Sequence, residues 1–325
     1  MNSFIFAANA TLPIVLTVAL GYFIKRLGIV TQSVASSVNK IVFRVLLPAM
    51  LFVNIYEIES IGSINLTYVG YVIGITVALF LIFIPIVSRL FSKRNQRGVI
   101  LQAIFRSNYA LVGIPLAEAL FGSEGVALAS ILAAFIIPVF NILAVICLSI
   151  YSDEKRPSVR SILIKILQNP LIISVVTALL VLAVRALFVR LDFSFRLSDA
   201  KPLFKVLKSL SSAATPMALL ALGAQFEFSA IPALKRQIIF GIAIRNAFIP
   251  AAALSIAYAM GIFEGAHFAT FVAMFTTPVA VSSVPMAESM GADHRLAGQI
   301  VIWTTILSSV TIFLASLILK SLGVF

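Results

Sequence analysis

A run of four polar residues, Arg106 to Tyr109, interrupts a long apolar stretch and is followed by Gly113 and Pro115. A guanidinium can hold a carboxylate through two parallel hydrogen bonds. Proline removes a backbone donor and crowds the carbonyl four residues earlier, so it can break a helix. Freed backbone groups at bilayer depth are tolerated only where protein buries them or a watery cavity solvates them. Polar residues at a helix break are typical of a transporter's substrate site, which is our prediction for this stretch.

The same pattern recurs 170 residues later. Residues 115–118 read Pro-Leu-Ala-Glu, and residues 285–288 read Pro-Met-Ala-Glu. The offset also aligns Ser107 with Thr277. We therefore expect the second stretch to supply the other half of the site, through Thr277, Pro278, Ser282, Ser283 and Pro285. Serine and threonine in membrane helices also bond their own backbone, so the hydroxyls have a local alternative role.

Asn108 is the first candidate for binding, with Ser107 and Tyr109 beside it. Its amide can hold a carboxylate or a cation, or it can cap the broken helix. Arg106 follows Arg97 by nine residues, which places it about 13 Å further along a helix. In a hydrocarbon core about 30 Å thick, that approaches the midplane. The alternative is that this side chain extends back to the cytoplasmic interface.

Composition assigns the class of protein. Of 325 residues, 61% are hydrophobic and 11% are charged, which predicts a polytopic membrane protein. The net charge of +12 lies mostly in short loops, where bases orient helices, so we expect no nucleic-acid partner. A single cysteine leaves no thiol pair for a metal, and we expect neither a metal nor a cofactor. The sequence lacks the common catalytic and phosphate-binding motifs, so we expect no enzyme and no ATP-driven pump.

Apolar runs of bilayer length predict an all-α fold with ten transmembrane helices. The predicted spans are 7–24, 36–56, 66–88, 99–121, 126–151, 169–189, 210–226, 237–262, 266–289 and 297–319. The related stretches fall in the fourth and ninth spans. Because five spans are an odd number, two five-helix repeats must enter the membrane in opposite orientations. The predicted division is a first repeat at 1–151, a cytoplasmic loop at 152–168 and an inverted second repeat at 169–325.

Loop charges predict that both termini lie on the outer side of the cytoplasmic membrane. With this orientation, fifteen bases fall on the inner side and seven on the outer side. Six of those seven lie within 185–208, where we predict a short interfacial helix leading into the seventh span. The sequence offers no reason for the positive charge of this stretch.

The segment from Asn108 to Gly122 resembles the fourth-helix motif of bacterial members of the auxin efflux carrier family. Pro278 and the segment from Ala287 to Asp293 resemble the family's ninth-helix pattern. The resemblance implies a scaffold domain and a transport domain in which helices four and nine break and cross at the substrate site. It also implies organic anions as substrates, auxin-like or similar to malate and malonate. Many relatives have an asparagine soon after the ninth-helix proline, where this chain has Val279 to Ser283.

The combined prediction is a secondary transporter that exports small organic anions by alternating access. The first alternative is a sodium- or proton-coupled symporter of the bile-acid carrier type, which would need carboxylates or amides around an ion. A receptor built on a transporter fold would usually need a signalling domain, and an intramembrane enzyme would need a nucleophile and a base. The expected partners are a small organic anion and the lipid bilayer, and a homodimer is left open.

Overall fold

The computed structural model describes residues 2–57, 66–151, 159–191, 196–261 and 263–324. The regular structure in this part of the chain consists of helical elements, and it contains no β-strand beyond one isolated bridge. Seven stretches are long and apolar enough to cross a membrane: Gln32–Tyr56, Thr67–Leu90, Tyr109–Ile150, Pro170–Phe188, Lys201–Gln225, Phe228–Met260 and His294–Ser321. The predicted class of a polytopic all-α membrane protein agrees with this architecture.

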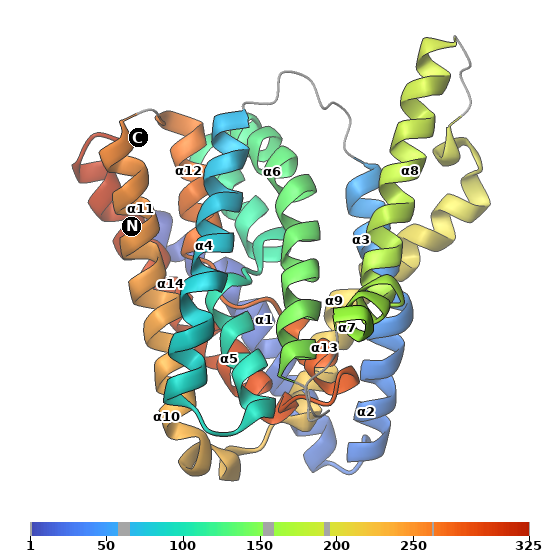
Figure 1. Cartoon of the computed structure of the whole chain (residues 1–325), viewed down its shortest axis with the longest axis vertical. Helices are drawn as coiled ribbons and strands as arrows, with labels where there is room; N and C mark the ends of the chain where they lie inside the picture. Colours follow the sequence, from blue (N-terminus) through green and yellow to red (C-terminus); the bar gives the residue numbers. More distant parts are fainter. Residues whose placement is uncertain (1, 58–65, 152–158, 192–195, 262, 325) are drawn as a thin grey trace.

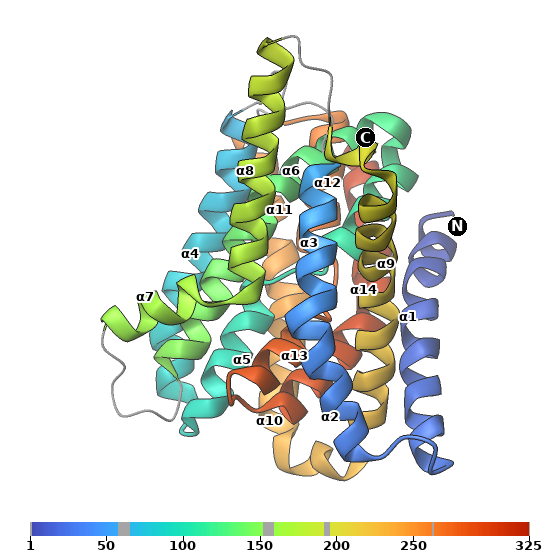
Figure 2. The same ribbon diagram turned by 90° about the vertical axis from the view of Figure 1, so that its right-hand side faces the viewer.

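One layer of the molecule, here called the scaffold layer, contains helices from both halves of the sequence. In Figure 2, α8, α3, α9 and α1 stand side by side, and each packs against the next. The bounds of the scaffold helices are α1 Asn2–Arg26, α2 Gln32–Ile41, η1 Val42–Leu46, α3 Leu47–Tyr56, α8 Pro170–Arg190 and α9 Lys201–Gln225. The short helix α7 Val159–Leu167 precedes α8 in the chain.

The remaining helices form a second body, here called the core, which lies mostly to the left of α3 and α8 in Figure 1. Its central contact joins α6 and α12, and α14 packs against α10, α13 and also α1 of the scaffold layer. The core helices are α4 Leu66–Leu90, α5 Arg94–Phe105, η2 Tyr109–Gly113, α6 Ile114–Ile150, α10 Ile231–Ala243, η5 Ile244–Phe248, α11 Ile249–Met260, α12 Gly265–Phe275, α13 Ser283–Ser289 and α14 His294–Ser321.

Three wide π-helical turns occur shortly before prolines: η1 and η5 lie between two helices, and η2 precedes α6. The turns η1, η2 and η5 end two residues before Pro48, Pro115 and Pro250 respectively. Proline lacks an N–H and its ring clashes with the carbonyl four residues earlier, so a wider turn relieves the conflict. Pro115 therefore does not break the chain where the sequence suggested. It opens α6, and the non-helical residues lie further upstream.

The predicted fourth and ninth spans do not correspond to single straight helices. Residues 99–121 are divided between α5, η2 and the start of α6, and α6 bends at Phe121 and Gly122. Gly122 has φ of 55°, which side-chain-bearing residues rarely adopt. Residues 266–289 are divided between α12 and α13. The number of ten spans stays a prediction.

The basic stretch at 185–208 differs from its predicted form. Residues 201–208 are the first turns of α9 itself, which continues to Gln225 as one helix rather than beginning as a separate interfacial helix. Lys208 of this segment forms an exposed ion pair of 2.6 Å with Glu57 at the end of α3.

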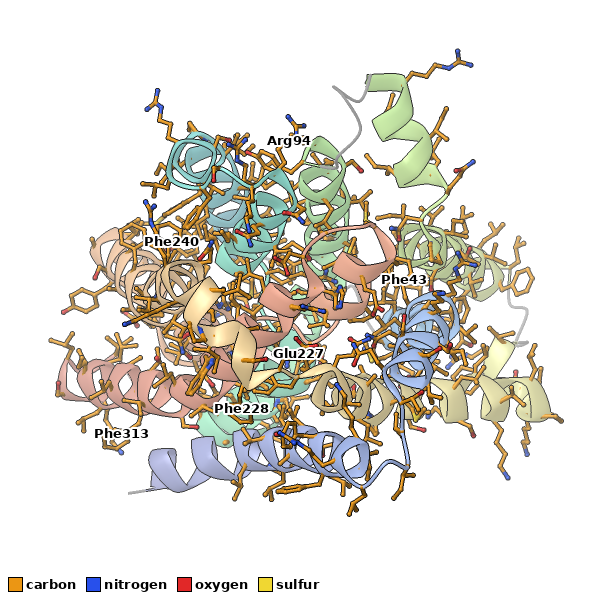
Figure 3. The ribbon with its side chains drawn as sticks, turned by 90° about the horizontal axis from the view of Figure 1, so that it is seen from below. Phe43, Arg94, Glu227, Phe228, Phe240 and Phe313 are labelled. Atoms are coloured by element: carbon orange, nitrogen blue, oxygen red, sulfur yellow. The ribbon has the colours of Figure 1, made fainter. Side chains whose placement is uncertain are left out.

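At the opposite end of the molecule, seen in Figure 3, Phe228 lies close to α1. Its ring packs edge-on against Tyr22 of α1, with ring centroids 5.5 Å apart. The adjacent Glu227 forms an ion pair with Arg295, with 3.5 Å between Oε2 and Nη1. These contacts tie the start of the α10 segment to α1 and α14.

Helices α1 and α9 approach closely enough to exclude any side chain at two positions. A Cβ atom at Gly223 would lie 1.9 Å from the Val18 carbonyl oxygen, and one at Gly21 would lie 2.2 Å from the Leu220 carbonyl oxygen. Both obstacles are backbone atoms, so relief requires the helices to separate. By contrast, a Cβ at Gly74 in α4 would meet nothing within 4 Å. The Gly70-to-Gly74 spacing therefore does not pack two helices of this chain together, although such a motif often does.

We expect Gly223→Ala to destabilise the protein by about 1–3 kcal/mol, the range for overpacking a tight contact. Thermal unfolding of the detergent-solubilised protein measures this, and Gly74→Ala is the matched control because it makes the same change where there is space. Equal melting temperatures for the two variants would show that the α1–α9 contact is looser than described.

Candidate functional site

Two helical regions of the core are interrupted by extended chain. The helix α5 ends at Phe105, and Arg106 has extended backbone angles, φ −95° and ψ 109°. Helical structure resumes at Tyr109 with η2. In the second half, α12 ends at Phe275, and helical structure resumes at Ser283 with α13. Each interruption therefore lies at one of the two related stretches.

The two extended segments pair with one another inside the core. Ser107 and Val279 form an antiparallel bridge. The Asn108 N–H donates to the Pro278 carbonyl at 2.8 Å, and the Ala280 N–H donates to the Arg106 carbonyl at 3.4 Å. These bonds satisfy backbone groups that neither helix can satisfy, as buried peptide groups require.

Side chains join the same two segments. The hydroxyls of Ser107 and Thr277 lie 2.6 Å apart, and both residues are buried. These are the two positions that the offset of 170 aligns in the sequence. The repeat motif therefore identifies residues that are in direct contact in space.

Arg106 is buried, with 4% of its surface exposed, and its guanidinium contacts neutral groups alone among the residues that the structure describes. It donates to the side-chain oxygens of Gln102 at 2.9 Å, Asn141 at 2.8 Å and Ser282 at 3.0 Å. A fourth contact of 3.1 Å reaches the sulfur of Met286. These contacts occupy Nη1 and Nη2, but among the described residues the positive charge has no anionic partner.

A cavity of about 60 Å³ lies against this guanidinium, between the core and the scaffold layer. The core contributes Arg106, Ser107, Asn108, Tyr109, Ala110, Leu111, Ile137, Phe140, Asn141, Ala280, Val281 and Ser282 to its walls. The scaffold layer contributes Leu47, Met50 and Leu51 from α3, Leu171 from α8, and Thr215 and Ala218 from α9. A few polar groups in an otherwise apolar wall are typical of a small-molecule site.

Asn108 contributes a second unusual group to this cavity. The residue is 5% exposed, and its side-chain NH₂ has no hydrogen-bond partner in the structure. Such a buried unpaired donor costs about 1–3 kcal/mol, so it calls for an acceptor. The backbone N–H of Asn108 is bonded to Pro278, and its side chain makes no bond to the neighbouring helix end.

The predicted site residues occupy two kinds of position. Arg106, Ser107, Asn108, Tyr109 and Ser282 line the cavity. The others lie behind it and shape the break: Gly113, Pro115, Thr277, Pro278, Ser283 and Pro285. Gly113 is required there, because a Cβ would lie 2.4 Å from the Tyr109 ring and 3.1 Å from the Ala273 carbonyl oxygen.

Three polar residues that belong to this arrangement were not predicted from the sequence. Asn141 and Gln102 are 1% exposed and bind the Arg106 guanidinium, and Thr215 lines the cavity from α9. A signal for Asn141 was available, because a lone amide in a membrane span, three residues after Pro138, is costly unless it has a partner. Nothing local distinguishes Thr215, which is placed by the packing of two distant helices.

Comparison with known proteins assigns the chain to a family of transporters. The sequence profile of a family described as Membrane transport protein matches residues 6–316. The chain is also 23% identical, over 331 aligned residues, to an uncharacterized transporter of Methanothermobacter thermautotrophicus. That alignment covers 97% of this chain and 99% of the relative. Because the profile spans nearly the whole sequence, the chain belongs to the membrane transport protein family, that of the auxin efflux carriers.

Proposed function

We propose that this transporter exports small organic anions, carboxylates of the auxin-like or malate- and malonate-like kind, and binds them in the cavity beside Arg106. The uncompensated charge of Arg106 carries this proposal. Insertion scales assign an arginine at bilayer depth roughly +2.5 to +3.5 kcal/mol. A carboxylate beside it would neutralise that charge, and the free Asn108 amide would donate to the same anion.

The electrostatics of the core favour an anion over a cation. Arg106 and Arg245 are the two charged residues that are buried in the described chain, and both are positive. The first turns of η2 and α13 follow the extended segments, and helix N-termini carry a partial positive charge. A substrate cation would have to enter this field without a carboxylate to pair with.

The proposed architecture has ten spans, in repeats at 1–151 and 169–325 joined by a loop at 152–168, of which residues 152–158 lie outside the described chain. The contact of Ser107 with Thr277 supports it, because residues related by a two-fold axis meet where they lie near that axis. The broken helices are then α5 with η2 and α6, and α12 with α13. Both termini face outward from the cytoplasmic membrane, as the distribution of bases favours.

Alternating access would move the core against the scaffold layer, because the cavity lies between them. A polar contact holds the two bodies together in this structure. The carboxylate of Glu288 in α13 accepts hydrogen bonds from Ser36 and Asn39 of α2, both of 2.6 Å, and from Gln225 of α9 at 3.2 Å. Glu118, at the position that the repeat aligns with Glu288, is exposed on α6.

The first prediction tests the anion site. Arg106→Gln should weaken binding of the best-bound carboxylate at least tenfold, about 1.4 kcal/mol, because the site loses its charge. Arg106→Lys should recover part of the affinity, since an ammonium keeps the charge but loses the bidentate fork. Thermal-shift titration with mono- and dicarboxylates measures affinity, because a ligand of the folded state raises apparent stability.

Arg94→Gln is the matched control for this experiment. It removes the same charge from an exposed side chain on α5 that donates to the Ile150 carbonyl, away from the cavity. Wild-type affinity in all three variants, with normal folding, would return Arg106 to a purely structural role.

The second prediction concerns the driving force. An anion leaving a compartment that is negative inside gains about 2.3 kcal/mol per charge per 100 mV, which sustains roughly a fiftyfold gradient. We expect an imposed potential alone to drive the bound carboxylate out of reconstituted vesicles that contain neither sodium nor ATP. Vesicles with the Arg106→Gln variant are the control. Flux that ignores potential but requires sodium, or a proton gradient, would favour the coupled symporter instead.

The third prediction tests relative movement of the two bodies. In Glu288→Gln an amide NH₂ replaces one of the two oxygens that accept from Ser36 and Asn39, so one of these hydrogen bonds is lost and the contact should loosen. Hydrogen exchange of the α2 backbone amides should rise, and the transport rate should change at least twofold while anion affinity stays within twofold. Glu118→Gln should match the wild type in all three measurements. Unchanged exchange and flux in Glu288→Gln would mean that this contact does not restrain the cycle.

A further inference from the structure

A second buried guanidinium lies on the other side of the paired segments. Arg245 is 1% exposed and belongs to η5, the π-helical turn between α10 and α11. Unlike Arg106, it does not line the cavity. Among the residues that the structure describes, it forms no ion pair with an acid.

All the partners of Arg245 are backbone carbonyls at the ends of the two interrupted helices. Its Nε and Nη2 donate to the Thr277 carbonyl at 2.9 and 2.7 Å. Nη2 also donates to the Met274 carbonyl at 3.2 Å, and Nη1 donates to the Ile104 carbonyl at 3.4 Å. Met274 lies in the last turn of α12 and Ile104 in the last turn of α5.

These carbonyls explain why a cation is needed there. The last carbonyls of a helix have no partner within it, and each helix C-terminus is equivalent to roughly −0.5 of an elementary charge. Two such ends that meet inside the core sum to about −1, which one guanidinium neutralises. Arg245 thus compensates the carbonyl ends, and Arg106 remains uncompensated on the side of the cavity.

Converging carbonyl oxygens at the ends of broken helices also have a second possible occupant. In ion-coupled transporters, unwound carbonyls and half-helix C-terminal ends coordinate sodium. We propose that Arg245 is a built-in cation in this chain. Its guanidinium takes the place of a bound sodium ion and holds the carbonyl ends of α5 and α12 together. It is then a positioning residue that keeps the extended segments paired without a coupling ion.

This proposal rests on the proposed transport function only for its consequence, sodium-independent export, and its test needs no substrate. The experiment compares melting temperatures of purified protein in choline chloride, in sodium chloride of equal ionic strength, and in choline chloride with millimolar guanidinium. The wild type should melt at the same temperature in all three. Arg245→Ala should melt lower by several degrees and be raised again by guanidinium, which fits the vacated space, and by sodium.

Two further variants make the result specific. Arg245→Lys keeps the charge and should show no response to sodium, whereas Arg245→Gln, which removes the charge with a smaller change in volume, should be stabilised by it. This pair decides the question if Arg245→Ala does not fold. Arg94→Ala, an exposed arginine on α5, should respond to neither cation.

The proposal is overturned if Arg245→Ala is as stable as the wild type, or if it is destabilised and neither cation restores it. An equal sodium response in the Lys and Gln variants would also overturn it. Failure of the wild type to bind any carboxylate would instead contradict the proposed function and leave the melting result intact. The two hypotheses can therefore fail separately.

Discussion

The constraint on which this structure depends is that a broken helix inside a bilayer must find new partners for its peptide groups. Water is absent there, and each unpaired group costs several kcal/mol. The chain meets the constraint by placing two breaks against each other, so that Asn108 bonds to Pro278 and Ala280 bonds to Arg106. Neither break could stand alone at this depth. The pairing of the two halves follows directly from this requirement.

Two arginines complete the arrangement, and their surroundings separate their roles. Arg245 is surrounded by carbonyl oxygens whose partial negative charges offset its positive charge. Arg106 contacts neutral side chains and borders a cavity. Residues of the same type in the same core thus differ in whether a charge remains to be compensated. That difference is the reason why we propose an anion site on the side of Arg106.

The scaffold layer contributes the opposite wall of the cavity. Small residues determine how closely the helices of this layer approach each other. Gly21 and Gly223 let α1 and α9 approach until carbonyl oxygens occupy the space of a side chain. Wide turns before Pro48 and Pro250 keep α2 continuous with α3 and α10 continuous with α11, where proline would otherwise break the helix. The Glu288 contact then joins this layer to the core through hydrogen bonds rather than through an ion pair.

Hydrophobicity and local chemistry by themselves determined the membrane class, the helical fold and the two stretches in which helical structure is interrupted. These properties follow from run length and from prolines beside polar residues, which neighbours in the chain suffice to define. The repeat even aligned Ser107 with Thr277, residues that touch. Local rules placed the first break at Pro115 rather than at Arg106 to Asn108. A proline can either break a helix or be accommodated by a wide turn before it, and the sequence does not show which of the two has the lower free energy.

Only the tertiary structure decided which polar residues meet. Glu118 and Glu288 occupy matching positions in the sequence, yet one is exposed and the other binds α2 and α9. Asn141 and Thr215 reach the cavity from helices that are distant in sequence from the breaks. Arg106 and Arg245 look alike as intramembrane cations until their partners are known. Contacts of this kind depend on which helix faces pack together, and that is a property of the whole fold rather than of any segment.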